Sequence, residues 1–141
     1  ARQCLQLEYL DVSCTGGNVT DEALLCLAQH SRSLRHLDVC GTLGSISDTG
    51  ITAVAQRCAD LRYLSVCSVN GAVTDKGISV VARSCPLLEH LDVSFDQGGI
   101  SDAGLLEVAR HCPNLLQLYA CWTNVTDTAV TAIAEGCRQL R

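Results

Sequence analysis

The sequence lacks the features that would mark a membrane, nucleic-acid or metal-binding protein. No apolar run approaches the roughly 20 residues that span a bilayer, and the N-terminus shows no signal-peptide core. The net charge is −5, and no basic run or patch is present, so nucleic acid is excluded as a partner class. No cysteine pair has the C-x2-C spacing of a zinc site, and we expect neither a metal nor a cofactor.

Methionine is absent as well. The chain also begins and ends inside a repeating pattern, without the polar capping repeats that close such arrays. We therefore expect the chain to be a fragment of a longer protein.

The pattern has a period of 27 residues, which is the spacing from Cys58 to Cys85 and from Cys85 to Cys112. Each of five units opens with two leucines followed, two residues after the second leucine, by valine or alanine. These sets are Leu7, Leu10, Val12; Leu34, Leu37, Val39; Leu61, Leu64, Val66; Leu88, Leu91, Val93; and Leu115, Leu118, Ala120. The last two residues of each set alternate with polar or aromatic residues, which predicts a strand with one buried face.

A helix is predicted in the second half of each unit. After a turn that is rich in glycine in the first four units, an apolar residue, a Ser or Thr, and an Asp follow in order, as in Ile46-Ser47-Asp48. The hydroxyl suits a helix N-cap, and the Asp suits the positive end of the helix dipole. An apolar stripe at helical spacing follows, for example Ile51, Val54, Ala55 and Cys58.

A single strand–turn–helix unit of this length cannot bury enough apolar surface to fold alone, so the units must stack. We predict one α/β array over residues 1–141, with repeats at about 4–30, 31–57, 58–84, 85–111 and 112–136. Its parallel strands would line the concave face of a leucine-rich-repeat solenoid, or horseshoe, and its helices the convex face.

Ten cysteines would suggest a disulfide framework in a short secreted chain. Here, one set falls at the helix end of successive repeats, and Ser31 replaces cysteine once: Cys4, Cys58, Cys85, Cys112 and Cys137. Stacked equivalents would lie about 5 Å apart, but their side chains should point together into the core. We predict a column of buried free thiols, and so many thiols indicate a reducing compartment, the cytoplasm or the nucleus.

Three more cysteines, Cys40, Cys67 and Cys121, lie one residue beyond the last inward strand position. They should face outward on the concave side, either as tolerated small surface residues or as reactive thiols. No neighbouring Lys or Arg is visible in the sequence to lower their pKa.

Two N-x-T sequons begin at Asn18 and Asn124. The threonines of these sequons, Thr20 and Thr126, are already explained as helix N-caps. Because glycosylation requires an oxidising route, we interpret the sequons as coincidental.

The repeat resembles the cysteine-containing class of leucine-rich repeats, and its fullest copy runs from Cys85-Pro-Leu-Leu88 through Ile100-Ser-Asp to Ala109-Arg-His-Cys112. That class is best known from F-box proteins, in which the repeats hold a substrate and a separate F-box binds the Skp adaptor of a cullin–RING ubiquitin ligase. The resemblance covers nearly the whole chain and implies the solenoid fold. The period is slightly longer than usual, and the residues at the end of the strand turn differ from the family's Cys or Asn: Thr15, Thr42, Val69, Asp96 and Thr123.

Strand alternation places a strip of side chains on the concave face. Its predicted partner-binding residues are Tyr9, Asp11, His36, Asp38, Tyr63, His90, Asp92 and Tyr119, with Phe95 and Trp122 at the strand exits. All five aromatic residues of the chain lie on this strip or its edge, and exposed aromatic residues are typical of interface hot spots. The alternative for Phe95 and Trp122 is that they cover the core beneath the turn.

The three aspartates of the strip form an acidic stripe, which either favours a partner with basic residues or is an ordinary solvated face. An open strip excludes little water, so we expect no catalytic residues and a protein-interaction module in place of an enzyme. The resemblance favours the substrate-recognition repeats of an F-box-type ubiquitin ligase subunit, with Skp adaptor and cullin recruited only through an F-box that this chain lacks. A non-ligase scaffold and an extracellular recognition protein are the alternatives.

Overall fold

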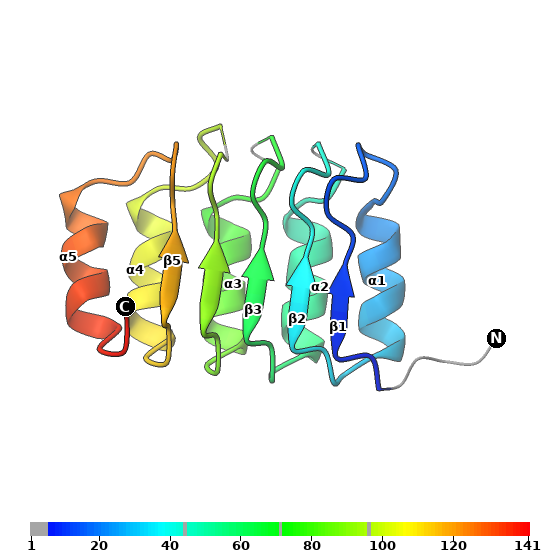
Figure 1. The fold of residues 1–141 in the computed structure, drawn as a ribbon, viewed down its shortest axis with the longest axis horizontal. Helices are drawn as coiled ribbons and strands as arrows, with labels where there is room; N and C mark the ends of the chain where they lie inside the picture. Colours follow the sequence, from blue (N-terminus) through cyan, green and yellow to red (C-terminus); the bar gives the residue numbers. More distant parts are fainter. Residues whose placement is uncertain (1–5, 44, 71, 96) are drawn as a thin grey trace.

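Five strands and five helices alternate along the chain in a computed structural model, which describes residues 6–43, 45–70, 72–95 and 97–141 (Figure 1). The strands are β1 (Tyr9–Asp11), β2 (His36–Asp38), β3 (Tyr63–Ser65), β4 (His90–Asp92) and β5 (Gln117–Tyr119). The helices are α1 (Asp21–His30), α2 (Asp48–Arg57), α3 (Asp75–Ser84), α4 (Asp102–His111) and α5 (Asp127–Gly136). Four residues of the repeat pattern lie outside the described residues: Cys4, Gly44, Gly71 and Asp96.

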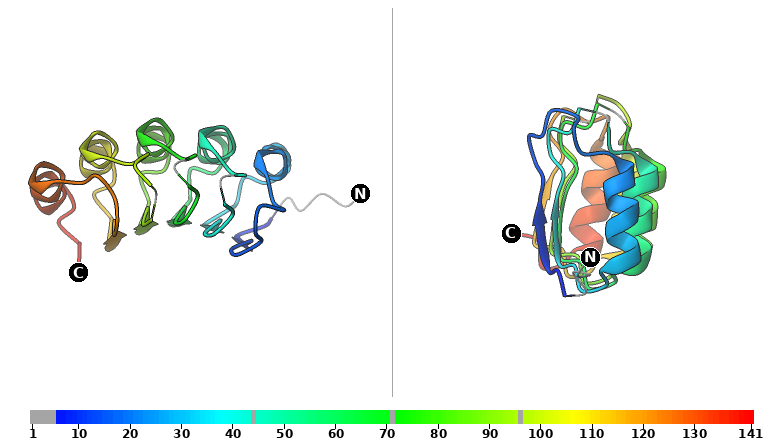
Figure 2. Two further views of the ribbon diagram at one scale, coloured as in Figure 1. Left: turned by 90° about the horizontal axis from the view of Figure 1, so that it is seen from above. Right: turned by 90° about the vertical axis from the view of Figure 1, so that its right-hand side faces the viewer.

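The strands pair in parallel and in chain order, forming a single five-stranded sheet. The register places equivalent residues side by side, so that Leu10 lies beside Leu37 and Leu64 beside Leu91. Seen from above, the units follow a shallow arc with the strands on its inner side and the helices on its outer side (Figure 2). The predicted solenoid, with a concave sheet and convex helices, is confirmed.

The core lies between the sheet and the row of helices. The strand leucines of the inner repeats are fully buried, as are the stripe residues Ile51, Val54 and Ala55 of α2. These side chains form one continuous cluster through all five units, so each unit completes its core with its neighbours. No helix within the described residues is long and apolar enough to cross a membrane.

An aspartate at the first position of each of the first four helices joins one repeat to the next. The Asp75 carboxylate accepts hydrogen bonds from the backbone N–H of Ser101 (2.9 Å), the Ser101 hydroxyl (2.6 Å) and the backbone N–H of Gly104 (2.9 Å). Asp21 and Asp48 accept the equivalent three bonds from the following repeats, and Asp102 binds Thr126. The sequence pattern predicted a negative charge at the helix start. It did not predict that the carboxylate would form hydrogen bonds with the next repeat.

The close approach of this carboxylate explains a glycine inside α4. A Cβ atom built on Gly104 would lie 2.6 Å from Oδ1 of Asp75, which is closer than any real contact. Glycine weakens a helix interior by roughly 1 kcal/mol relative to alanine. Here, that cost is offset because the bare backbone N–H of Gly104 can reach the carboxylate of the preceding repeat.

The predicted N-caps are confirmed in four of the five helices. The side chains of Ser47, Thr74, Ser101 and Thr126 each accept a hydrogen bond from a backbone N–H of the helix that follows. Thr20 adopts the same extended backbone, but its side chain makes no cap bond, so this prediction was wrong. In the other repeats, the N-cap hydroxyl also donates to the first aspartate of the preceding helix, and this bond orients it. The described part of the chain contains no helix before α1, so it offers Thr20 no such aspartate.

The predicted thiol column is present at the other end of the helices. Cys58, Cys85, Cys112 and Cys137 are buried and free. Each donates its S–H toward a backbone carbonyl in the last turn or at the C-cap of the preceding helix, for example from Cys85 to Cys58 O at 3.6 Å and from Cys137 to Cys112 O at 3.5 Å. Ser31 does the same with its hydroxyl toward Leu7 O.

The position at which the resembled family places Cys or Asn makes a local bond in the turns after β1 and β5. The hydroxyls of Thr15 and Thr123 donate to carbonyls three residues earlier, at Val12 and Ala120. Val69 is buried in the same position, and the buried Thr42 hydroxyl has no partner within the described residues. Among the described residues, this position therefore makes no side-chain bond between repeats.

The hydrogen bonds between Asp75 and the next repeat predict that two aspartate-to-alanine substitutions will differ in their effect on stability. Asp75→Ala removes one acceptor from three donors, and we expect it to lower the free energy of unfolding by about 2–3 kcal/mol. Asp127→Ala is the matched control, because Asp127 also opens a helix but accepts no side-chain or backbone bond from the described residues of another repeat. Its loss should stay within the helix-dipole contribution of roughly 0.3–1 kcal/mol. Urea unfolding measures both, and equal losses would contradict the role of these bonds.

Candidate functional site

Rings from four neighbouring strands stack on the concave face. Tyr9 and His36 lie with ring centroids 4.0 Å apart, and His36 and Tyr63 with centroids 3.9 Å apart, in nearly parallel planes. Tyr63 and His90 continue the row in a tilted arrangement at 6.0 Å. We call these four side chains the ring ladder. Each residue was predicted to face outward, but the stacking was not, although the alternation of Tyr and His at the same repeat position was its signal.

The ring ladder ends in an amide and a last tyrosine on β5. His90 Nδ1 lies 3.2 Å from Oε1 of Gln117, and the Tyr119 hydroxyl donates to the same oxygen at 3.4 Å. Tyr9 and Tyr119, at the two ends, are 59% and 52% exposed, while the inner rings are half-buried by their neighbours. The strip is therefore a nearly continuous surface of flat rings across the sheet.

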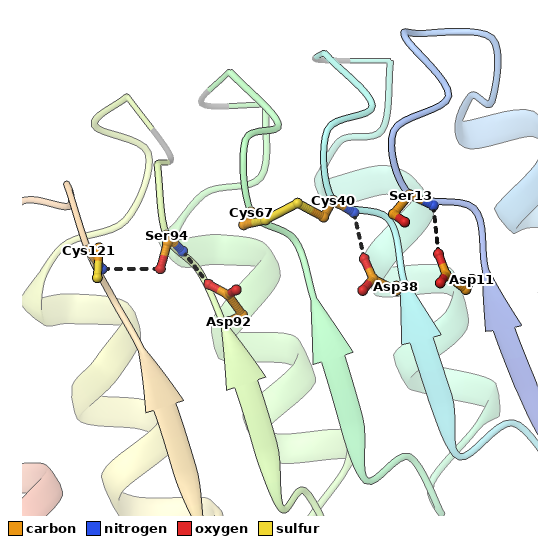
Figure 3. The surroundings of a disulfide bond; sticks show 8 residues. All are labelled: Asp11, Ser13, Asp38, Cys40, Cys67, Asp92, Ser94 and Cys121. Atoms are coloured by element: carbon orange, nitrogen blue, oxygen red, sulfur yellow. Dashed lines mark hydrogen bonds between the residues drawn. A yellow bond between two sulfur atoms is a disulfide. The ribbon is translucent and has the colours of Figure 1, made fainter.

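The predicted acidic stripe runs beside the ring ladder. Oδ1 of Asp11, Asp38 and Asp92 accepts the backbone N–H two residues ahead, each at 2.9 Å. These bonds hold the carboxylates at the carboxyl ends of their strands, as Figure 3 shows. Bonding to Ser13 lowers the pKa of Asp11 below its ordinary 3.8.

The stripe acts on the rings next to it. Burial lowers the pKa of His36 below its ordinary 6.5, and the charges of Asp38 and Asp11 oppose that shift. Burial raises the pKa of Tyr63 above its ordinary 10.0, and Asp38 and Asp92 raise it further. His36 and Tyr63 thus present uncharged rings at neutral pH, framed by carboxylates.

The basic side chains nearest to the strip are already paired. Along its lower edge, Arg35 pairs with Glu8 and Arg62 with Glu89. The remaining ion pairs among the described residues involve Glu107 on α4. None of them neutralises the acidic stripe, so the strip is negative.

A disulfide joins two strand exits on the same face (Figure 3). Cys40 and Cys67 are bonded, with their Cα atoms 4.6 Å apart. The prediction that both are free thiols was therefore wrong. Parallel register brings equivalent residues to disulfide distance, and beyond the strand their side chains are free to turn toward one another, which the buried column does not allow. Cys121, at the same position in the last repeat, is free and exposed.

Phe95 and Trp122 lie on the upper rim, just beyond the strands. They are 50% and 80% exposed, so the alternative in which they cover the core was wrong. Their rings stack on each other with centroids 6.4 Å apart.

The rim contains two columns of left-handed residues that the sequence did not reveal. Positive φ angles recur one period apart, first at Cys14, Gly41, Ser68, Phe95 and Trp122, and then at Gly16, Leu43, Asn70 and Gln97. Glycine occupies only one position in each column. The same left-handed turn therefore recurs from repeat to repeat even where the residue is not glycine. The rim also contains a hollow of about 460 Å³, which we call the rim notch. It is lined by Leu43, Ser68, Asn70, Phe95, Gln97 and Trp122.

Comparison with known proteins shows the fold. No protein-family model matches the sequence, and no curated protein matches it either. Among solved structures, the chain is similar to actin-binding site 2 of leiomodin-1, with a TM-score of 0.71 and 14% identity over 97% of this chain and 82% of that chain. It is also similar to the C-terminal domain of tropomodulin from Caenorhabditis elegans, with a TM-score of 0.67 and 13% identity over 97% of this chain and 86% of that chain. At these identities, the likeness supports a leucine-rich-repeat-like α/β architecture.

The cysteines divide into classes that labelling can separate. Burial raises the pKa of Cys85 and of Cys112 to about 12, so these thiols stay protonated and shielded. Cys14, Cys26 and Cys121 are exposed and free. We expect iodoacetamide to modify these three in the native protein, and the buried column only after denaturation.

Reduction of the denatured protein should then add two further thiols, Cys40 and Cys67, which tryptic mass spectrometry identifies. If both are alkylated in the unreduced, denatured protein, the disulfide assignment is wrong.

Proposed function

We propose that the chain is a protein-interaction module that binds its partner across the concave strip. The observation that carries the proposal is the ring ladder, whose four side chains pack one against the next beside the acidic stripe. Aromatic residues dominate interface hot spots, because a flat ring buries much apolar area. Here, the rings already hold one another in place before a partner arrives, so little side-chain entropy remains to be lost on binding.

The charge of the strip favours a partner with basic residues. Each stripe carboxylate accepts a backbone N–H at its own strand end, and none takes part in an ion pair among the described residues, so all three are acceptors for Lys or Arg. Opposite charge on the partner would raise the association rate and select against acidic competitors.

For the finer role, we favour substrate recognition in an F-box-type ubiquitin ligase. The resemblance of the repeats to the cysteine-containing class supports it, and the buried thiol column matches that pattern. Skp adaptor and cullin would join through an F-box elsewhere in the protein. A non-ligase scaffold is the second candidate, because the similar leiomodin-1 structure is named as an actin-binding site.

Purification of the full-length protein from its own cells separates the two roles. A ligase subunit should bring Skp adaptor and cullin in stoichiometric amounts. A preparation that carries bound partner proteins but neither ligase component would exclude the ligase role and leave the scaffold.

A co-sedimentation assay with filamentous actin tests the scaffold role separately. It shows whether the purified chain binds actin, as the name of the leiomodin-1 structure suggests.

The concave face can be tested by paired substitutions. Tyr63→Ala removes the central ring of the ladder, and we expect at least a tenfold loss of affinity for the co-purified partner, or about 1.4 kcal/mol. Gln56→Ala, on the exposed side of α2, is the control and should leave the affinity unchanged. Surface plasmon resonance with the immobilised chain gives both values. Equal losses would refute the concave assignment.

A further inference from the structure

The rim notch offers apolar side chains that the fold itself does not use. Leu43, Phe95 and Trp122 are 57%, 50% and 80% exposed, and they surround a single hollow that opens on the same edge as the strand exits. Three large apolar side chains gathered around one hollow on an otherwise polar rim are typical of an interaction site.

The same three residues also carry backbone strain. Their φ angles are +54° for Leu43, +56° for Phe95 and +58° for Trp122, in the left-handed region where a side chain costs roughly 1–2 kcal/mol. Gly16 and Gly41 hold equivalent positions in other repeats, so glycine satisfies the turn. Because little of that cost is recovered through burial, the bulky side chains are better explained by contact with another molecule.

Two amide side chains line the notch and bind each other. Nε2 of Gln97 donates to Oδ1 of Asn70 at 3.0 Å, which links the turns of two neighbouring repeats. Within the described residues, the other amide groups, Nδ2 of Asn70 and Oε1 of Gln97, have no bond. One donor and one acceptor side by side match the C=O and N–H of an extended peptide backbone.

Two carboxylates, Asp38 and Asp92, lie at the ends of strands that lead into the turns of the notch. The Asp92 carboxylate accepts the backbone N–H of Ser94, and Phe95 is the next residue in the chain. One short segment therefore carries both an acidic group and an apolar group. Asp38 lies two strands away, or about 10 Å at the usual strand spacing. The ion pairs among the described residues engage Glu8, Glu89 and Glu107, so neither aspartate is neutralised.

We propose that the rim notch and these two aspartates recognise one extended segment of a protein partner, in which a large apolar residue is flanked by Lys or Arg. The apolar side chain fills the space between Leu43, Phe95 and Trp122, and the amide pair of Asn70 and Gln97 binds the backbone. The basic side chains reach down to Asp38 and Asp92. The inference rests on the proposed function and specifies the chemistry of the partner.

A library of random linear peptides displayed on phage, selected on the immobilised chain, tests the proposal. Enriched peptides should combine Phe, Leu or Trp with Lys or Arg within a few residues. Enrichment of acidic or purely polar peptides, or no enrichment at all, would overturn it.

Substitutions then locate the selected peptide. Phe95→Gly and Trp122→Gly each remove a ring and relieve the left-handed backbone, and we expect at least a tenfold loss of peptide affinity without a fall in thermal stability. Cys14→Gly is the matched control, because it makes the same backbone change in the same column but lies outside the notch lining, and it should leave affinity unchanged. Asp38→Asn and Asp92→Asn keep the oxygen that binds the backbone, and they should weaken binding and flatten its dependence on salt.

The variant Tyr63→Ala separates this inference from the proposed function. If Tyr63→Ala abolishes peptide binding and the two glycine variants do not, the notch proposal is wrong and the concave strip remains the binding surface. If the glycine variants abolish binding and Tyr63→Ala does not, the notch is the site and the role of the ring ladder is wrong.

Discussion

The hydrogen bonds from each helix-start aspartate to the next repeat are the interaction on which the rest of the structure depends. The sheet alone fixes the strands at one edge of each unit, because its backbone bonds join only the inner side of the arc. At the start of the helices, the carboxylates of Asp21, Asp48, Asp75 and Asp102 bind the N-cap residue and, in the first three cases, a helix N–H of the following unit. They set the offset between helices, while the thiol column bonds their far ends. Stacking with a constant offset is what keeps the concave strip continuous.

A constant offset has a chemical consequence for every surface position. Residues one period apart become neighbours at about strand spacing, so a single residue type repeated in the sequence becomes a column in space. The rings of the ladder, the thiol column and the left-handed turn residues all follow this rule. The Cys40–Cys67 disulfide does as well, because the same register that stacks Tyr63 on His36 brings those two sulfur atoms together.

The sequence predicted the fold and the outward strip because both depend on periodicity. Leucine spacing identified the strands, the Ser/Thr-Asp motif identified the helix starts, and strand alternation placed all ten strip residues on the concave side or its rim. Contacts between repeats were harder to predict, since they depend on where side chains of different units meet. The Asp75 carboxylate, for example, was interpreted only within its own helix. Whether the strip binds a partner is a question of function that neither periodicity nor fold decides.

Some features could not be predicted from the sequence because they arise from backbone angles. Phe95 and Trp122 were placed at the strand exits, but their exposure follows from the left-handed turn that directs them outward, and a bulky residue gives no warning of such a conformation. The disulfide was missed for a related reason. Parallel side chains within a strand point the same way, and only the departure of the chain from the strand lets Cys40 and Cys67 face one another.

Contacts between secondary-structure elements occur only between successive units, α1 with α2 and β1 with β2 onward, throughout the described residues. A molecule built in this way behaves as a one-dimensional row, in which disorder can begin at either end and spread one unit at a time. The ring ladder crosses four units, and residues from four units also line the rim notch. A partner that lies across them would connect units that otherwise have no direct contact, so binding would convert a row of separately opening repeats into one cooperative body.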